Sequence, residues 1–506
     1  MKTYLTRRAL LAGGFSSLGM AALADAPLTA IRPEARSVEA QIGTPPDRPD
    51  KRPRARPSSE TIVADSGLAG TVAFVVADAR TGAVLEEREA DVPLPPASVT
   101  KAVTALYALD VLGADHRFDT RLLATGPIED GILMGDLILA GGGDPTLTTD
   151  HLAELAIALR TAGISEVQGA FKVWGGALPY VNEIEPSQLD HLGYNPAVSG
   201  LNLNFNRVHF EWTRSGGAYQ VAMDARTDLY RPDVTVARMR VADRSLPIYT
   251  YSDGGGIDDW TVARAALGDG GSRWLPVRYP SLYAGDVFTT FARSNGIVLT
   301  APERIGLLPE AQELARHESE PLDQIITDML RYSTNLTAEV IGLAASFARS
   351  ASPQSLTQSA QIMREWVGAE FGADAFFSDH SGLADTTRVT ARDMVRILSG
   401  ARQSSALSTL LKDIAMTDSQ GDLMRDAPVS VVAKTGTLNF VSTLAGYARA
   451  QEGRELVFAI FSADIDARDR AKAAGDEIPQ GSRSYNSAAK RLQQRLLQRW
   501  GTVFPA

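Results

Sequence analysis

The sequence predicts an α+β fold in which one domain is interrupted by a long, β-rich insertion. Short runs of β-branched and other apolar residues lie near both ends of the 506-residue chain, at Val72–Val76 and at Leu456–Phe461. Segments with helical periodicity lie between them, and the middle of the chain carries no chemical motif. A sheet whose strands come from both chain ends, with helices between, is typical of an α+β domain that contains an insertion.

The first elements of this domain are a predicted hairpin and a predicted helix. Val72–Val76 and Val84–Leu85 are the strands of the hairpin, and Thr81-Gly82 is its turn. A loop with three prolines then leads into Val99–Leu112. The apolar residues of this last segment recur with helical spacing and dominate it, so we expect a buried helix.

A glycine triplet follows the next predicted strand. Leu137–Leu139 is apolar and runs directly into Gly141-Gly142-Gly143. Glycine-rich loops that bind phosphate continue with Lys and Ser or Thr, whereas this one continues with Asp144-Pro145. The triplet therefore indicates a tight structural turn.

The rest of the chain divides into a β-rich middle and a mixed C-terminal part. The middle, from about 150 to 300, contains short apolar runs that predict strands at Ala170–Trp174, Leu201–Val208 and Val234–Val241. Helical periodicity returns at Leu322–Leu330, Leu336–Phe347, Ile362–Phe371 and Ala391–Leu398. Strands are predicted at Ser430–Ala433, Thr443–Tyr447 and Leu456–Phe461, and an amphipathic helix at Ala488–Leu497.

The N-terminus has the features of an export signal. Lys2, Arg7 and Arg8 precede an apolar run, and Ala22-Leu23-Ala24 has the form of a signal-peptidase site. The paired arginines leave both the general secretory and the twin-arginine route open. Residues 25–60 are rich in proline and arginine and predict an extended linker. We therefore expect a signal peptide at 1–24, an interrupted domain at 61–125 and 310–506, one or two inserted domains at 126–309, and a periplasmic location.

Composition excludes several classes of function. The formal charge of −10 argues against a nucleic-acid-binding protein, which needs a basic surface. The chain has no cysteine, which excludes disulfides and thiolate chemistry. Its six histidines are scattered and form no HxxxH pair, so we expect neither a metal site nor a cofactor. After the signal, no stretch is long and apolar enough to span a bilayer.

The first candidate motif is Ser98-Val99-Thr100-Lys101, at the start of the predicted buried helix. Side chains at i and i+3 share one helix face, so the hydroxyl and the amine can meet. The amine can accept the hydroxyl proton only when it is neutral, and burial lowers a lysine pKa toward that state. A second Ser-x-x-Lys, Ser487 to Lys490, falls on the predicted solvated side of the last helix.

Two further motifs follow in the C-terminal part. Lys434-Thr435-Gly436-Thr437 continues a predicted strand and suits the binding of a substrate carboxylate by an amine and a hydroxyl, with glycine leaving room. Ser333-Thr334-Asn335 opens a predicted helix, and alone it is explained as helix capping. The order of the three motifs and their places on helix starts and a strand favour a common site.

This order is the signature of the penicillin-recognising serine enzymes. The 235 residues between Ser98 and Ser333 are too many for a β-lactamase. The chain resembles the D-alanyl-D-alanine carboxypeptidase/endopeptidase family that includes penicillin-binding protein 4, peptidase family S13. The likeness covers most of residues 66 to 465 and includes Leu94–Ser98, Gly141–Leu147, Leu201–Asn206, Asp379–Leu383 and Lys434–Leu438. It implies a penicillin-binding, β-lactamase-like transpeptidase fold, with an antiparallel sheet flanked by helices.

The resemblance also implies a role for each motif residue. Ser98 would be the acylated nucleophile, Lys101 its general base, and Ser333 a proton relay to the leaving amine. Asn335 would hold the substrate amide, while Lys434 and Thr435 would bind the terminal carboxylate and Gly436 would leave room for it. The backbone amides of Ser98 and Thr437 would form the oxyanion hole.

The implied protein is an exported serine-type D-Ala-D-Ala carboxypeptidase, with D,D-endopeptidase activity left open. Its substrates would be peptidoglycan stem peptides, and β-lactams would acylate the same serine. The alternatives are an esterase or β-lactamase on the same scaffold, and a protein that binds peptidoglycan without cutting it. Three positions depart from the family pattern Asp-Gly-Ser-Gly-Leu-Ser-Arg: His380 replaces a glycine, Ala384 replaces a serine, and Asp385 replaces the basic residue.

Overall fold

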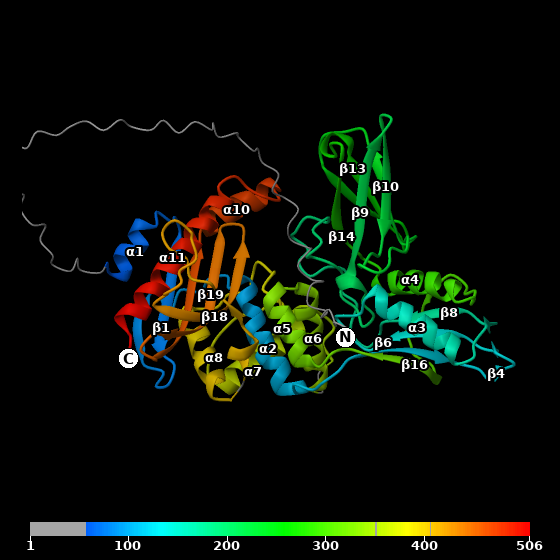
Figure 1. Ribbon diagram of the computed structural model, residues 1–506, viewed down its shortest axis with the longest axis horizontal. Helices are drawn as coiled ribbons and strands as arrows, with labels where there is room; N and C mark the ends of the chain where they lie inside the picture. Colours follow the sequence, from blue (N-terminus) through cyan, green and yellow to red (C-terminus); the bar gives the residue numbers. More distant parts are fainter. Residues whose placement is uncertain (1–56, 350–351, 405) are drawn as a thin grey trace, which may run out of the picture. The chain divides into compact units, whose positions relative to one another are not determined.

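The computed structural model describes residues 57–349, 352–404 and 406–506 (Figure 1). The predicted signal peptide and the predicted linker as far as residue 56 lie outside the described residues. Helix α1, Ser59–Asp65, begins inside the range predicted as linker, and Ser58 caps it by accepting the Thr61 backbone N–H. No helix in the described part of the chain is long and apolar enough to cross a membrane.

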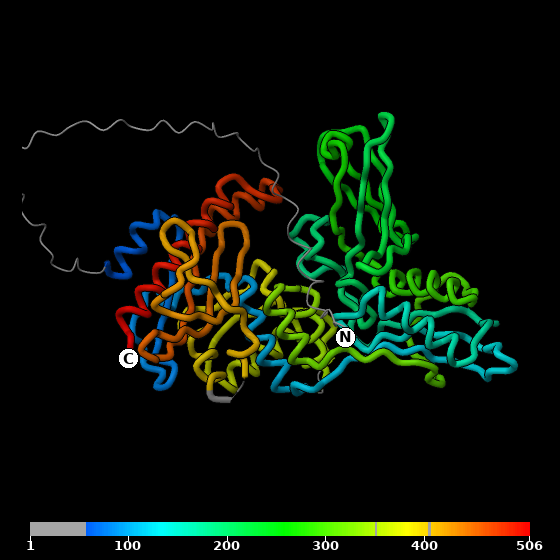
Figure 2. Tube along the Cα trace, in the orientation of Figure 1, coloured from blue at the N-terminus to red at the C-terminus, as the bar shows by residue number. Residues whose placement is uncertain are grey.

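A six-stranded antiparallel sheet is the centre of the part of the chain outside the insertion. Its strand order is β17-β18-β19-β20-β1-β2, so the N-terminal strand β1 lies between β20 and β2. The strands are β1 Thr71–Asp78, β2 Val84–Arg88, β17 Lys412–Asp413, β18 Val429–Leu438, β19 Val441–Ala450 and β20 Glu455–Ala463. Strands from the first and the last parts of the described chain thus pair in one sheet, which confirms the predicted fold class (Figure 2).

Helices cover both faces of this sheet. β19 is buried at nine of its ten positions and β20 at eight of its nine, because each has a core on both sides. On one face, α1 and α11 (Ser482–Val503) pack through Leu492, Leu496 and Trp500. The other face carries α2 Thr100–Leu112, α5 Leu322–Tyr332, α6 Asn335–Ala348, α7 Leu356–Phe371 and α8 Ala391–Ser404. The predicted helices and the C-terminal strands are confirmed.

The insertion lies between α2 and α5 and contains four sheets. The largest has the order β15-β8-β6-β3-β16. Its strands are β3 Asp119–Ala124, β6 Leu137–Gly141, β8 Phe171–Trp174, β15 Glu303–Arg304 and β16 Gln312–Glu318. β3 and β16 pair with each other, so this sheet extends beyond both ends of the predicted 126–309 range. The pairing of β3 with β16 and with β6 assigns both strands to the insertion sheet.

Three small sheets complete the insertion. β9 Arg207–Ser215 pairs with β10 Ala218–Asp224 and β14 Gly270–Pro276. β13 Asp258–Ala263 lies between β11 Ala237–Ala242 and β12 Tyr249–Asp253. The third sheet joins β4 Ile128–Glu129, β5 Ile132–Leu133 and β7 Glu166–Val167. The strands β7 to β14, all between residues 150 and 300, confirm the predicted β-rich middle.

The structure differs from the predicted elements of the middle in two respects. Helices α3, Thr149–Thr161, and α4, Pro280–Ser294, were not predicted and pack against the insertion sheets. The predicted strand at 201–208 begins only at Arg207, because residues 204–206 adopt positive φ angles of 49° to 57°. Asparagine side chains stabilise this turn: Asn206 Oδ1 accepts the Leu203 N–H and Asn202 Oδ1 accepts the Ser199 N–H.

Candidate active site

Ser98 lies in a tight turn at the entrance of α2. Residues Ala97–Val99 form one turn of 3-10 helix, and Ala97 has a positive φ of 48°. Strand β19 supports the turn, since the Thr443 hydroxyl donates to the Pro96 carbonyl at 2.7 Å. Two glycines allow the close packing: a Cβ at Gly436 would lie 2.8 Å from the Pro96 oxygen, and one at Gly382 would lie 1.9 Å from the Ala97 oxygen.

Lys101 lies one helical turn after Ser98 and is fully buried. Its Nζ is 3.1 Å from Ser98 Oγ, 2.7 Å from Asn335 Oδ1 and 2.7 Å from the Ser381 carbonyl oxygen. The motif Ser98–Lys101 and the motif Ser333–Asn335 therefore meet at the Lys101 amine. The order of the motifs in the sequence had favoured such a common site. Burial lowers the pKa of Lys101 to about 8, although the nearby Asp379 and Glu339 carboxylates favour its charged form.

Ser333 lies at the junction of α5 and α6. It ends α5 in the left-handed conformation, with φ 61°, and Thr334 is the N-cap residue of α6. Asn335 is the first residue of α6. Its Oδ1 accepts from Lys101, and its Nδ2 donates to the Tyr194 carbonyl oxygen at 2.9 Å. The motif thus serves to place two side chains at the site rather than to cap the helix with Ser333.

Lys434 reaches the same site from strand β18. Its Nζ donates to Ser333 Oγ at 3.0 Å and to the Thr435 carbonyl at 2.8 Å. Burial, reinforced by the charge of Lys101, holds the pKa of Lys434 well below its usual range. Along the strand, Lys434 and Gly436 are buried whereas Thr435 and Thr437 are exposed.

The outer edge of β18 is open beside this site. Strand β17 pairs only with Val432 and Ala433, and within the described residues no strand pairs with that edge from Lys434 onward. The unpaired backbone groups there can bind an extended peptide as an added strand.

Two buried carboxylates surround the lysine and were not singled out as site residues. Glu339 follows Asn335 by four residues on the same face of α6, and its carboxylate accepts the N–H groups of His380 and Ser381. Asp379 accepts the N–H groups of Gly382, Leu383 and Ala384 at 2.7–2.8 Å. Together the two carboxylates fix the backbone of residues 380–384, and the Ser381 carbonyl in this segment accepts the hydrogen bond from Lys101. Burial and the Asp379 charge raise the pKa of Glu339 to about 8.

His380 fills a space that a glycine in α6 provides. The imidazole is completely buried, stacks on Tyr107 with an interplanar angle of 4°, and forms a 2.7 Å hydrogen bond between Nε2 and Ser359 Oγ. A Cβ at Gly342 would lie 2.2 Å from the His380 ring. Burial lowers the pKa of His380 to about 3, so the ring is neutral at physiological pH.

The second Ser-x-x-Lys pair, Ser487 and Lys490, is exposed on α11. It therefore lies outside the candidate site.

Among the described residues, one group has the spacing to hold a metal ion, namely His209, Glu211 and Asp224. The Arg226 guanidinium pairs with both of its carboxylates at 2.5–2.6 Å, so a cation already occupies this place.

Comparison with known proteins gives consistent matches over most of the chain. The profile of the family described as "D-Ala-D-Ala carboxypeptidase 3 (S13) family" matches residues 58–480. A D-alanyl-D-alanine carboxypeptidase of Actinomadura sp. (strain R39) is 28% identical over 476 residues, 85% of this chain and 86% of that protein. The D-alanyl-D-alanine carboxypeptidase DacB of Haemophilus influenzae is 24% identical over 415 residues, 77% of this chain and 85% of that protein.

A solved structure shows the same fold. The crystal structure of penicillin binding protein 4 (dacB) from Haemophilus influenzae superposes with a TM-score of 0.68 at 20% identity, covering 87% of this chain and 100% of that one. The same protein complexed with a β-lactam gives a TM-score of 0.67 at 19% identity over 87% of this chain.

Proposed function

The chain belongs to the D-Ala-D-Ala carboxypeptidase 3 (S13) family, and from this premise we propose that it is an exported serine-type D-Ala-D-Ala carboxypeptidase acting through an acyl-Ser98 intermediate. The single observation that carries the proposal is a pair of buried lysines, close enough for their charges to interact, that hold the polar side chains of the three motifs. Lys101 contacts Ser98 and Asn335, and Lys434 contacts Ser333.

Acylation begins with attack of Ser98 Oγ on the penultimate D-Ala carbonyl carbon. Lys101 in its neutral form accepts the hydroxyl proton across the 3.1 Å contact. With a pKa of about 8, about a tenth of the lysine is neutral at pH 7. The Ser98 and Thr437 amides stabilise the charge that develops on the carbonyl oxygen.

Release of the C-terminal D-Ala requires a proton on its nitrogen. Ser333 is placed to deliver it, because its hydroxyl lies 3.0 Å from Lys434 Nζ. Lys434 and Thr435 bind the terminal carboxylate at the open edge of β18, and Asn335 binds the substrate amide. Ser333 is reprotonated by Lys434, and Lys101 releases the Ser98 proton to solvent, from which Lys434 recovers its own. Water then attacks the Ser98 ester, Lys101 accepts the water proton and returns it to Ser98 Oγ as the ester bond breaks, and the shortened stem peptide leaves. A β-lactam acylates Ser98 by the same attack.

Labelling with a fluorescent penicillin tests the nucleophile. We expect the parent protein and Ser487→Ala, which alters the exposed second Ser-x-x-Lys, to label equally. Ser98→Ala is expected not to label. Equal labelling of Ser98→Ala would show that another residue is the nucleophile. No labelling of the parent would contradict the assignment and leave a non-hydrolytic peptidoglycan-binding protein as the better hypothesis.

Product analysis separates the remaining activities. Incubation with a stem pentapeptide should release free D-Ala, and incubation with a cross-linked dimer shows whether the enzyme is also a D,D-endopeptidase. Rapid release of opened β-lactam without D-Ala release would instead favour a β-lactamase or esterase. Export to the periplasm is checked by fractionation of cells that carry the chain with and without residues 1–24.

A further inference from the structure

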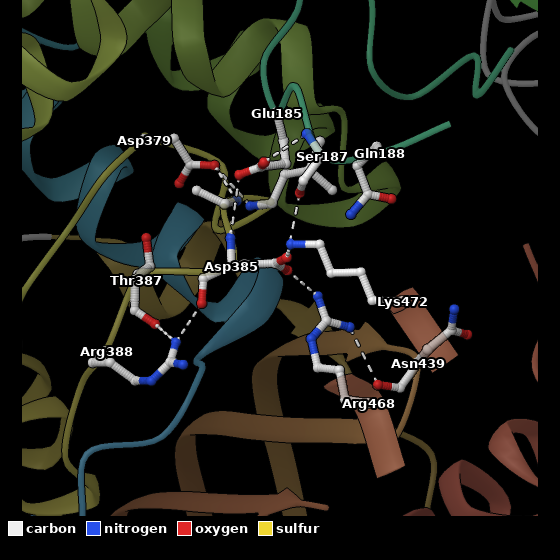
Figure 3. A network of polar contacts seen from close by, with 12 residues as sticks. Glu185, Ser187, Gln188, Asp379, Asp385, Thr387, Arg388, Asn439, Arg468 and Lys472 are labelled. Carbon is white, nitrogen blue, oxygen red and sulfur yellow. Dashed lines mark hydrogen bonds and ion pairs between the residues drawn. The ribbon is translucent and has the colours of Figure 1, made fainter. Parts of the chain in front are cut away.

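Asp385 occupies the centre of a polar network that joins segments far apart in the sequence (Figure 3). Its carboxylate pairs with Arg468 and Lys472, both on helix α10, Ile465–Ala474. It also accepts from the Ser187 hydroxyl at 3.3 Å. The Asp385 side chain is 20% exposed and that of Arg468 only 11%. One carboxylate therefore joins its own loop, the helix after β20 and the insertion.

One route leads from Asp385 to the general base. Asp385 directly follows the segment 379–384, which the Asp379 carboxylate holds in place through the N–H groups of residues 382–384. The Ser381 carbonyl in this segment accepts the hydrogen bond from Lys101 Nζ. A displacement of Asp385 therefore changes the position of an oxygen that contacts the reacting amine.

A second route leads to Asn335 through the insertion. The Asp385 N–H donates to Glu185 Oε2 at 3.3 Å. The backbone N–H and carbonyl of Glu185 are both bonded to the buried Asn195 side chain, at 2.9 and 3.0 Å. Tyr194, the residue before Asn195, accepts the Asn335 Nδ2 hydrogen bond through its carbonyl. The amide of Asn335 is thereby oriented with Oδ1 toward Lys101.

We propose that Asp385 is a positioning residue for catalysis: its ion pairs with Arg468 and Lys472 fix the two segments whose carbonyls hold Lys101 and Asn335. This inference rests on the proposed function. It explains the departure at 385, because a basic residue there would face Arg468, Lys472 and the neighbouring Arg388, whose Nη1 donates to the Asp385 carbonyl. The charges on α10 require an acid at this position.

Charge reversal and its restoration test the proposal. We expect Asp385→Arg to lower the second-order rate constant of penicillin acylation about tenfold, because like charges at these distances repel in a partly buried setting. The combined variant Asp385→Arg/Arg468→Glu/Lys472→Glu should recover most of the loss, since both ion pairs are restored with opposite polarity. If Asp385→Arg does not fold, Asp385→Asn replaces it, because asparagine keeps the size of the side chain but removes the charge. The rate constant of penicillin acylation should again fall.

A pH profile distinguishes positioning from general destabilisation. The Ser381 carbonyl favours the charged form of Lys101, so its displacement should move the midpoint of acylation to lower pH. Asp379, Glu339 and Lys434 also face this amine and remain unchanged in the variants. An unchanged midpoint together with an unchanged rate in folded Asp385→Arg would overturn the proposal, as would failure of the swapped ion pairs to recover the rate.

Asp259 provides a matched control. Its carboxylate is 10% exposed and is held by two cations, Arg238 at 2.9 Å and Arg240 at 3.0 Å, within the β11–β13 sheet of the insertion. Asp259→Arg should lower the unfolding temperature but leave the acylation rate of the folded protein unchanged. Absence of labelling in the parent protein would contradict the proposed function, whereas labelling with an insensitive Asp385 would contradict this inference alone.

Discussion

Lys101 is the residue whose protonation should control the rate of acylation. Its amine must be neutral to accept the Ser98 proton, and burial lowers its pKa to about 8. We therefore expect the rate of penicillin acylation to rise with pH about tenfold per unit below pH 8 and to level above it. Stopped-flow measurements from pH 6 to pH 10 check this. A flat profile between pH 6 and pH 9 would contradict the role of Lys101 as base.

Gly382 allows the nucleophile turn to take its position. A Cβ at residue 382 would overlap the Ala97 carbonyl oxygen at 1.9 Å, next to Ser98. Gly382→Ala should thus slow acylation at least about tenfold, because even a small displacement of a reacting group is costly. Gly82→Ala is the control: Gly82 has φ 73°, close to the 74° of Gly382, but no atom lies within 4 Å of its Cβ position. Equal loss in both variants would attribute the effect to backbone strain alone.

At the residue scale, spacing in the sequence predicted some members of the site and missed others. Ser98 and Lys101 are one helical turn apart, so their contact follows from local geometry. Glu339 has the same relation to Asn335, but a lone glutamate in an apolar helix has no motif that marks it. Tyr194 contributes its carbonyl, which every residue has, and meets Asn335 across 141 residues of chain. No side-chain pattern could reveal that contact.

At the scale of elements, α6 packs closely against the segment 379–384 where Gly342 faces the His380 ring. Gly342→Ala would place a Cβ 2.2 Å from the His380 ring, in a region without free space. We expect it to lower the free energy of unfolding by about 2 kcal/mol, since overpacking of a core typically costs 1–3 kcal/mol. Urea denaturation provides the measurement.

The double variant Gly342→Ala/His380→Gly supplies the control for this pair. Removing the imidazole removes the overlap, so the cost of the alanine should disappear against the His380→Gly background, and alanine should then be favoured as the better helix former. Additive effects of the two changes would show that the residues are not coupled. Leu343→Ala, at a residue buried in the separate cluster with Leu336 and Val340, should remain additive with His380→Gly.

The type of an element was predictable wherever the spacing of its apolar residues and the length of the segment indicated the same structure. α5 to α8 and β18 to β20 show clear periods or continuous apolar runs, and they occur where expected. α3 was hidden because the surrounding segment is rich in glycine and polar residues, although Leu152, Leu155, Ala156 and Leu159 follow a helical period. The predicted strand included the turn at 204–206, because the conformation of this turn depends on an asparagine side chain, Asn206, that bonds to the backbone.

At the scale of the whole described chain, the insertion reaches the candidate active site through residues 181–198, since the Tyr194 carbonyl accepts from Asn335. Val181 and Val198 pair at the base of this loop, and Arg278 lies beneath it with 2% of its side chain exposed. The guanidinium donates to the carbonyls of Asn182, Asn195 and Asp190 at 2.7–3.1 Å. Such long-range support depends on tertiary packing, which the sequence patterns of the middle region do not reveal.

Arg278→Gln should release this loop. The shorter neutral side chain cannot reach all three carbonyls, and buried carbonyls without donors are costly, so we expect the free energy of unfolding to fall by about 3 kcal/mol. Limited proteolysis should then cleave within residues 182–195, and penicillin acylation should slow because Tyr194 no longer fixes Asn335. Arg240→Gln, at an arginine that is 64% exposed, should change stability by less than about 0.5 kcal/mol and leave the loop intact. Resistance of the loop to protease in Arg278→Gln, with an unchanged acylation rate, would show that the catalytic part positions Asn335 without the insertion.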